Sequence, residues 1–312
     1  MNTVPIFKKA DVHGRGAKAS CVGVPGFTLV ELVLVIALTG VVAAGLMVFF
    51  IPATNSYFDA RRRAGLTDHA DTALRRMARD IRIAVPNSIR SPGNQCFELL
   101  PTLTGGRYRM ASDVVSDAAT CTSATCSAPL DTSQSSTGFD VLSPMPTLPA
   151  VGDWVVVGNQ NPNDVYAGTN RTAITAIANA PNAAFGQQRL TFGAQQFPLG
   201  YAGGRFSIVA NNGGAPAVFY ICDGADGTVD AQGNGKGTLY QLSRPFAPAY
   251  PASCPAAAGA AVVTRNVRSC NFVYSPSIGS TQQRGFVWMQ LDLSESNETL
   301  SLSFGAHVDN VP

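Results

Sequence analysis

The chain has 312 residues with a hydrophobic fraction of 46%, which is enough to bury a substantial core, so it is not a disordered protein. Its formal net charge is +2, and residues 1–26 contribute +3 of it, which leaves −1 for the remainder. A nearly neutral protein of this kind gives no general electrostatic case for binding nucleic acid.

The first predicted element is an apolar helix over residues 27–51. These 25 residues contain a single charge, Glu31, and at about 1.5 Å per residue they are long enough to cross a hydrocarbon core of ~30 Å. A secretory signal fits poorly, because its apolar region is shorter and ends at a small-residue cleavage site. Basic residues before the helix place the N-terminus in the cytoplasm and everything after Ile51 outside.

Glu31 needs a partner, because a carboxylate inside a spanning helix costs about 2.5 to 3.5 kcal/mol. If the chain were cut after Gly26, Phe27 would gain a free α-amino group four residues before Glu31 on the same helix. An amine and a carboxylate that are each costly in a low dielectric can neutralise each other between adjacent subunits. This pairing would set the register of a helical fibre.

Residues 26–31 read GFTLVE and precede an uninterrupted apolar stretch. This motif resembles the class III signal of type IV pilins and of type II secretion pseudopilins. The resemblance implies that residues 1–26 are a leader, that a prepilin peptidase cuts between Gly26 and Phe27, and that Phe27 is N-methylated. It also implies that Glu31 docks the subunit onto a growing filament. The 26-residue leader is longer than the commonest ones.

The same resemblance implies where the protein acts and with what. The chain would sit in the inner membrane with a single span and its head in the periplasm, and later in a pilus at the cell surface. Its partners would be the prepilin peptidase, other major and minor pilins, and an inner-membrane assembly platform.

A second, amphipathic helix is predicted over residues 52–85, continuing into the head. Pro52 should kink or locally melt the chain at its start. Apolar or small residues then recur at spacings of three and four, which predicts one buried stripe. The stripe comprises Leu66, Ala70, Ala73, Met77, Ile81 and Ala84.

The polar face of this helix carries arginines interleaved with aspartates. Asp71 with Arg75, and Arg76 with Asp80, are predicted to pair four residues apart. Such a surface is typical of a solvated or subunit-facing helix, and binding of DNA here is not expected. The helix should end near Val85, because the proline that follows disfavours helical geometry in that residue.

Residues 86–312 predict a β-rich head, so the fold class is α+β: a long N-terminal helix packed on a mostly antiparallel sheet with long loops. Short apolar segments separated by Gly, Asn and Pro give the expected strands. These are 139–142, 154–157, 172–177, 189–192, 205–209, 217–222, 238–242, 261–267, 271–274, 285–293 and 299–304.

Six of the seven cysteines follow the proposed cut, an even number that fits a periplasmic or surface protein with up to three disulfides. They are Cys96, Cys121, Cys126, Cys222, Cys254 and Cys270. The spacing predicts a local bridge from Cys121 to Cys126. A second should join Cys222 to either Cys254 or Cys270.

The sequence offers little for catalysis, so no enzyme and no cofactor are predicted. Beyond the leader only His69 and His307 remain, and no Walker loop, GxSxG, HExxH or CxxC occurs. Asp223, Asp226 and Asp230 in DGADGTVD are weak candidates for calcium ligands, since the EF-hand spacing is absent.

Two further segments narrow the resemblance. Residues 71–90, DTALRRMARDIRIAVPNSIR, and 307–312, HVDNVP, are similar to MshO-type minor pilins of the mannose-sensitive haemagglutinin (MSHA) pilus system. That resemblance implies a subunit that primes or caps pilus assembly. Two alternatives stay open: a pseudopilin of a type II secretion system, and a tip subunit whose head binds a surface ligand or DNA.

Overall fold

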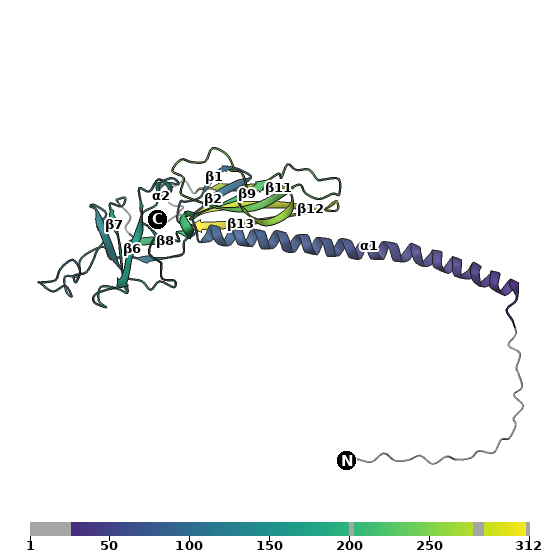
Figure 1. Cartoon of the computed structure of the whole chain (residues 1–312), viewed down its shortest axis with the longest axis horizontal. Helices are drawn as coiled ribbons and strands as arrows, with labels where there is room; N and C mark the ends of the chain where they lie inside the picture. The colour runs from purple at the N-terminus through teal and green to yellow at the C-terminus, as the bar shows by residue number, and fades with distance from the viewer. Residues whose placement is uncertain (1–25, 200–202, 277–283, 310–312) are drawn as a thin grey trace, which may run out of the picture. The chain divides into compact units, whose positions relative to one another are not determined.

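The computed structural model describes residues 26–199, 203–276 and 284–309 (Figure 1). The predicted leader lies outside the described residues except for Gly26, and so do Cys21 and the last three residues of HVDNVP. The chain divides into two compact units, Met1–Tyr57 and Phe58–Pro312. The predicted α+β class is confirmed, with one long helix and thirteen strands in the described chain.

Helix α1 runs from Leu29 to Arg82 and belongs to both units. It continues through Pro52, so local melting of the helix at this residue is not found, and a kink there stays a prediction. The helix also ends three residues earlier than predicted. Beyond Arg82 the backbone turns to pair with a neighbouring segment: Val85 N–H donates to the Leu100 carbonyl at 2.8 Å, and Ala84 forms a bridge with Pro101.

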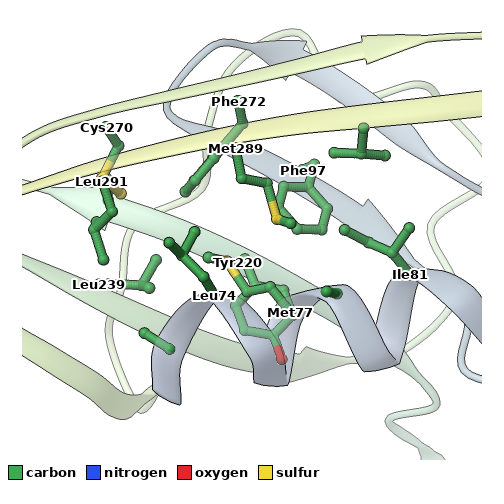
Figure 2. Packing of buried hydrophobic residues seen from close by; sticks show 14 of the residues in the cluster. Leu74, Met77, Ile81, Phe97, Tyr220, Leu239, Cys270, Phe272, Met289 and Leu291 are labelled. Atoms are coloured by element: carbon green, nitrogen blue, oxygen red, sulfur yellow. A yellow bond between two sulfur atoms is a disulfide. The ribbon is translucent and has the colours of Figure 1, made fainter. Parts of the chain in front are cut away.

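In the second unit, the predicted apolar stripe of α1 is buried, as expected. Leu66, Ala70, Ala73, Met77 and Ile81 are all at most 2% exposed. Figure 2 shows Met77 and Ile81 directed at the large side chains of the sheet behind them, among them Phe97, Tyr220 and Met289. Because this strip consists of small and apolar residues without charge, the helix can pack closely against the sheet.

The sheet beneath the helix has seven strands, and each neighbouring pair is antiparallel. We refer to it as sheet 1. In spatial order its strands are β1 (Arg90–Gly93), β2 (Cys96–Leu99), β9 (Ala217–Asp223), β10 (Gly237–Arg244), β11 (Ala261–Ser275), β12 (Arg284–Glu295) and β13 (Glu298–Asp309).

The head contains a second sheet that the sequence did not predict as separate. Sheet 2 has six strands, again with antiparallel neighbours: β3 (Thr104–Arg107), β8 (Arg205–Val209), β5 (Trp154–Val156), β6 (Arg171–Asn179), β7 (Gln188–Gln195) and β4 (Ser136–Val141). All six lie in the chain between β2 and β9. Sheet 2 is therefore an insertion between two neighbouring strands of sheet 1.

Each sheet has a core of its own. Sheet 1 shares its core with α1, whereas Phe139, Phe192 and Phe206 form the centre of a separate apolar cluster in sheet 2. A third cluster, which includes Val85 and the short helix α2 (Asp164–Ala167), lies at the junction of the two. One turn of 3₁₀ helix, Asn212–Gly214, precedes the return to sheet 1.

Two local features explain where the predicted strands differ from the observed ones. The segments 261–267 and 271–274 form one strand, β11, because a bulge between Val267 and Ser269 lets the strand continue through the residues between them. Asn266, at φ 58°, lies just before this bulge. The β12–β13 hairpin closes through Ser296 and Asn297, both at positive φ, as a two-residue turn requires. Strands β1, β2 and β3 were not predicted.

Candidate functional site

The proposed processing site lies at the start of α1. Gly26 and Phe27 precede the helix and are exposed. The Thr28 hydroxyl oxygen accepts a hydrogen bond from Glu31 N–H at 3.2 Å, so Thr28 caps the helix and Glu31 occupies its first turn. A carboxylate there is favoured by the helix dipole. The sequence did not reveal this cap, although the T-x-x-E spacing within GFTLVE was a signal for it.

The apolar half of α1 has no covering in the described chain. Among the described residues, α1 is the one helix that is long and apolar enough to cross a membrane, with a mean hydropathy of 2.7 over its most apolar window, none of it buried. Phe27 is 79% exposed and Phe49 78%. An apolar surface of this extent needs lipid or apolar partners, and the helix is consistent with a membrane anchor.

All six cysteines after residue 26 form disulfides. The predicted bridge Cys121–Cys126 is present, and Cys222 is joined to Cys270, one of its two predicted partners. Cys96 and Cys254 form the third bridge, 158 residues apart in sequence. Cys254 is therefore held against the outer face of sheet 1, in a cluster with Phe219 and Ile221.

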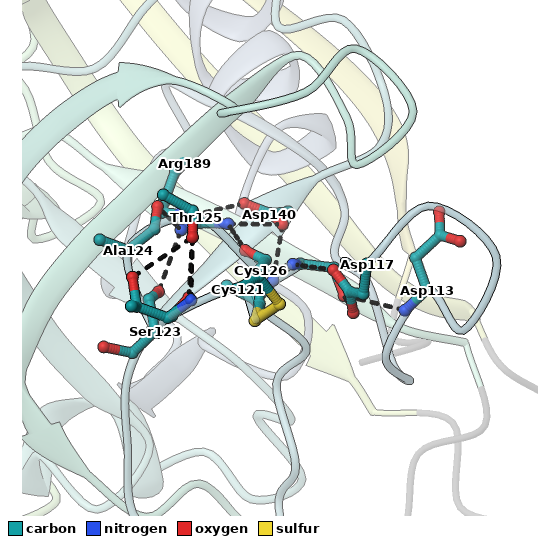
Figure 3. Close-up of a disulfide and its surroundings, with 12 residues drawn as sticks. Asp113, Asp117, Cys121, Ser123, Ala124, Thr125, Cys126, Asp140 and Arg189 are labelled. Atoms are coloured by element: carbon teal, nitrogen blue, oxygen red, sulfur yellow. Dashed lines mark hydrogen bonds and ion pairs between the residues drawn. A yellow bond between two sulfur atoms is a disulfide. The ribbon is translucent and has the colours of Figure 1, made fainter. Parts of the chain in front are cut away.

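The Cys121–Cys126 bridge closes a loop that Arg189 fastens to sheet 2 (Figure 3). Arg189 donates to the Asp140 carboxylate at 2.7 Å and to the carbonyls of Ala124 and Cys126 at 3.0 and 2.6 Å. One loop is therefore held by a covalent bond and by a charged side chain. Its geometry is fixed independently of the long helix.

Asp117 lies beside this bridge and, with Cys121 and Cys126, forms the one group of potential metal ligands that the described residues contain. The two sulfurs are bonded to each other and cannot act as thiolate ligands. The Asp117 carboxylate accepts from the N–H and the hydroxyl of Ser127 at 2.6 and 2.7 Å, and these bonds lower the pKa of Asp117. Asp117 therefore fixes the conformation of its own loop through Ser127.

The structure does not gather Asp223, Asp226 and Asp230 into a metal-binding group. Asp226 accepts from the hydroxyl and N–H of Thr228, which lowers its pKa. Asp230 accepts from the N–H groups of Asn234 and Gln232, and its pKa is lowered for the same reason. Asp226 and Asp230 cap the turns of their own loop, so turn geometry explains these two calcium candidates. Asp223 is the last residue of β9.

Of the two ion pairs predicted on α1, one is present and one is not. Arg75 donates to Asp71 at 2.6 Å, as predicted. The Arg76–Asp80 pairing is wrong: Arg76 donates to Gln241, and Asp80 accepts from the Tyr220 hydroxyl at 2.6 Å. Both residues therefore bond to side chains of sheet 1 rather than to each other across one turn of α1. His69 on α1 is exposed, and His307 on β13 is exposed beside the ring of Phe286.

A buried ionic cluster that sequence reasoning missed lies at the junction of the two sheets. Arg90 and Glu98 are both fully shielded from solvent, and Arg244 donates to the other oxygen of Glu98 at 2.7 Å. The Arg90 guanidinium also lies 3.5 Å from the centre of the Tyr166 ring on α2. Burial and the Glu98 carboxylate raise the pKa of Tyr166 well above its usual value. A glutamate inside the apolar run CFELL was the available signal.

No model of a known protein family matches this chain, and neither the curated proteins nor the solved structures contain a match to it.

Proposed function

We propose that this chain is a membrane-anchored, pilin-like subunit that a prepilin peptidase processes between Gly26 and Phe27. The observation that carries the proposal is the GFTLVE sequence at the start of α1, where Thr28 caps the helix and Glu31 lies in its first turn. The helix that follows presents an uncovered apolar surface before its later turns are buried in the head. A subunit anchored in a membrane and then packed in a fibre needs both properties.

In this proposal Glu31 serves assembly. After cleavage, the new α-amino group of Phe27 on an incoming subunit and the Glu31 carboxylate of its neighbour neutralise each other in an apolar surrounding. This pairing favours one axial position of each subunit in the fibre, because a shifted subunit would leave both charges unpaired.

The architecture of the head favours a minor subunit of an MSHA-like pilus over a repeating shaft subunit. Sheet 2, with the loop that the Cys121–Cys126 disulfide closes, adds a second apolar core to the unit formed by α1 and sheet 1. A bulky addition of this kind hinders dense packing along a whole fibre but not at its end. The alternative of a type II secretion pseudopilin uses the same N-terminal chemistry and is distinguished by the secretion genes beside its own.

The test is the N-terminus of the protein recovered from membranes of a host that contains a prepilin peptidase. Intact mass and N-terminal sequencing should give a chain that begins at methylated Phe27. Gly26→Val should block this cleavage, because a branched side chain replaces the small residue at the cut. An uncut chain, or a cut at another position, would remove the proposal.

A further inference from the structure

One recess of the head lies at the β3–β8 edge of sheet 2, next to the end of α1. Its volume is about 320 Å³, within the range of small-ligand sites. Val85 and Pro86, just beyond α1, form one wall, while β5 and β8 contribute Val156 and Ser207. The recess therefore has an apolar floor with a polar rim.

Two arginines line this recess from adjacent strands. Arg107 on β3 and Arg205 on β8 are direct partners in the antiparallel register, so their side chains leave the same face of the sheet with Cβ atoms about 5 Å apart. The next residue pair on that face is Gly105 and Ser207. Ser207 lines the recess beside the two cations.

These arginines differ from several others in the head. Arg90, Arg109 and Arg189, for example, each contact a carboxylate. Within the part of the chain that the structure describes, neither Arg107 nor Arg205 has a side-chain hydrogen bond or ion pair, and no acidic residue lines the recess. Like charges directly opposite each other on neighbouring strands are unfavourable. Both side chains are exposed, and an anion bound between them would relieve this repulsion.

A neighbouring recess extends the same positive surface. It has a volume of about 390 Å³, shares Pro86 and Ser207 with the first, and is lined by Arg82 at the end of α1. No acidic side chain lines this recess either, among the described residues. The two recesses together present three arginines.

We propose that this recess binds a small organic oxyanion, a carboxylate or a phosphate, held between the guanidinium groups of Arg107 and Arg205. Planar guanidinium groups bind both kinds of oxyanion through paired N–H donors. The apolar floor and the Ser207 hydroxyl suit a ligand of the size of one acidic sugar ring. This binding does not depend on the membrane anchor or on assembly into a fibre.

The experiment uses the full-length chain in a non-ionic detergent and isothermal titration calorimetry. Galacturonate and galactose are matched probes, since they differ only at the carboxylate, and inorganic phosphate tests the other oxyanion. We expect galacturonate, phosphate or both to bind, and galactose to bind at least tenfold more weakly. Arg107→Gln and Arg205→Gln should each weaken binding of the anion by at least tenfold.

Arg75→Gln is the matched control, because it removes the same charge from a surface arginine that pairs with Asp71 outside the recess. It should leave the affinity unchanged. Arg107→Gln should not lower the unfolding temperature without ligand, since it removes a repulsion, and this separates lost binding from lost folding. Absent binding of both anions, equal binding of galactose, or an equal loss in Arg75→Gln would overturn the proposal.

Discussion

Nε of Arg90 lies 2.8 Å from a carboxylate oxygen of Glu98, and neither side chain has any surface exposed to water. The other oxygen of Glu98 accepts from Arg244 on β10. Arg90 in turn donates to the carbonyls of Ala247 and Ala249, at 3.1 and 3.0 Å. A single buried carboxylate thus holds two arginines, and one of them fastens the loop after β10.

Replacing this carboxylate should be severely destabilising. Glu98→Gln leaves the fully buried Arg90 and the partly exposed Arg244 without a counter-charge, so we expect a loss of about 3 to 5 kcal/mol in the free energy of unfolding. Urea denaturation of the full-length chain in detergent, followed by tryptophan fluorescence, measures it. Asp71→Asn is the control, because it breaks the exposed pair with Arg75 and should cost less than about 1 kcal/mol. Equal losses in the two variants would contradict this account.

The three disulfides should contribute to stability in the order of the loops they close. In the chain-entropy treatment, the bridge between Cys96 and Cys254, 158 residues apart, contributes about 5 kcal/mol. The bridge between Cys121 and Cys126, separated by 5, contributes about 2 kcal/mol. Cys-to-Ala double variants, compared by urea denaturation, should follow this order with Cys222–Cys270 between them. A reversed order would refute it.

The interaction of Asp117 with Ser127, next to the loop that the Cys121–Cys126 disulfide closes, should weaken in acid. Hydrogen bonds from Ser127 lower the pKa of Asp117 in the folded chain, whereas an unfolded aspartate titrates near 3.9. The resulting stabilisation is complete above that unfolded value and is lost as the pH falls through the lowered pKa of the folded state. The unfolding temperature should therefore drop below about pH 4. Asp117→Asn should flatten this drop, and Ser127→Ala should flatten it in part; a wild-type slope in both would count against it.

The proposed role of Glu31 predicts a defect in assembly alone. Glu31→Gln should be inserted and cleaved normally, but its incorporation into fibres should fall on the order of a hundredfold, as loss of one partner from a buried ion pair implies. Immunoblotting of membrane and sheared-fibre fractions separates the two steps. Glu31→Asp keeps the charge and should retain more incorporation than Glu31→Gln. Normal incorporation of Glu31→Gln would refute the neutralisation argument.

Local patterns predicted the elements that depend on neighbouring residues. The stripe from Leu66 to Ile81 follows from helical spacing, and β8 was predicted at its observed limits, residues 205–209. Strands β1 to β3 were missed because they are four residues each, and β1 and β3 also contain Pro or Gly, which are uncommon in strands. Their strand geometry comes from partners that are distant in sequence, such as β9 for β2.

The candidate functional residues likewise include some that local sequence predicts and others that only the fold brings together. GFTLVE is a contiguous motif and could be read directly, as could the close spacing of Cys121 and Cys126. The Arg107–Arg205 pair could not, because 98 residues separate two arginines that only the β3–β8 register brings together. The Arg90–Glu98 pair left one trace in the sequence, a glutamate within an apolar run, but its second partner Arg244 lies far along the chain.

The insertion of sheet 2 also has a consequence for how this head can change. The chain leaves sheet 1 after Leu99 and re-enters it at Ala217, and Leu99 pairs directly with Val218. Because the exit and the return lie side by side, the outer loops of the inserted segment can change in length while the register of sheet 1 is preserved. The part of the insertion that contains α2 is more constrained, since Tyr166 packs against the buried Arg90.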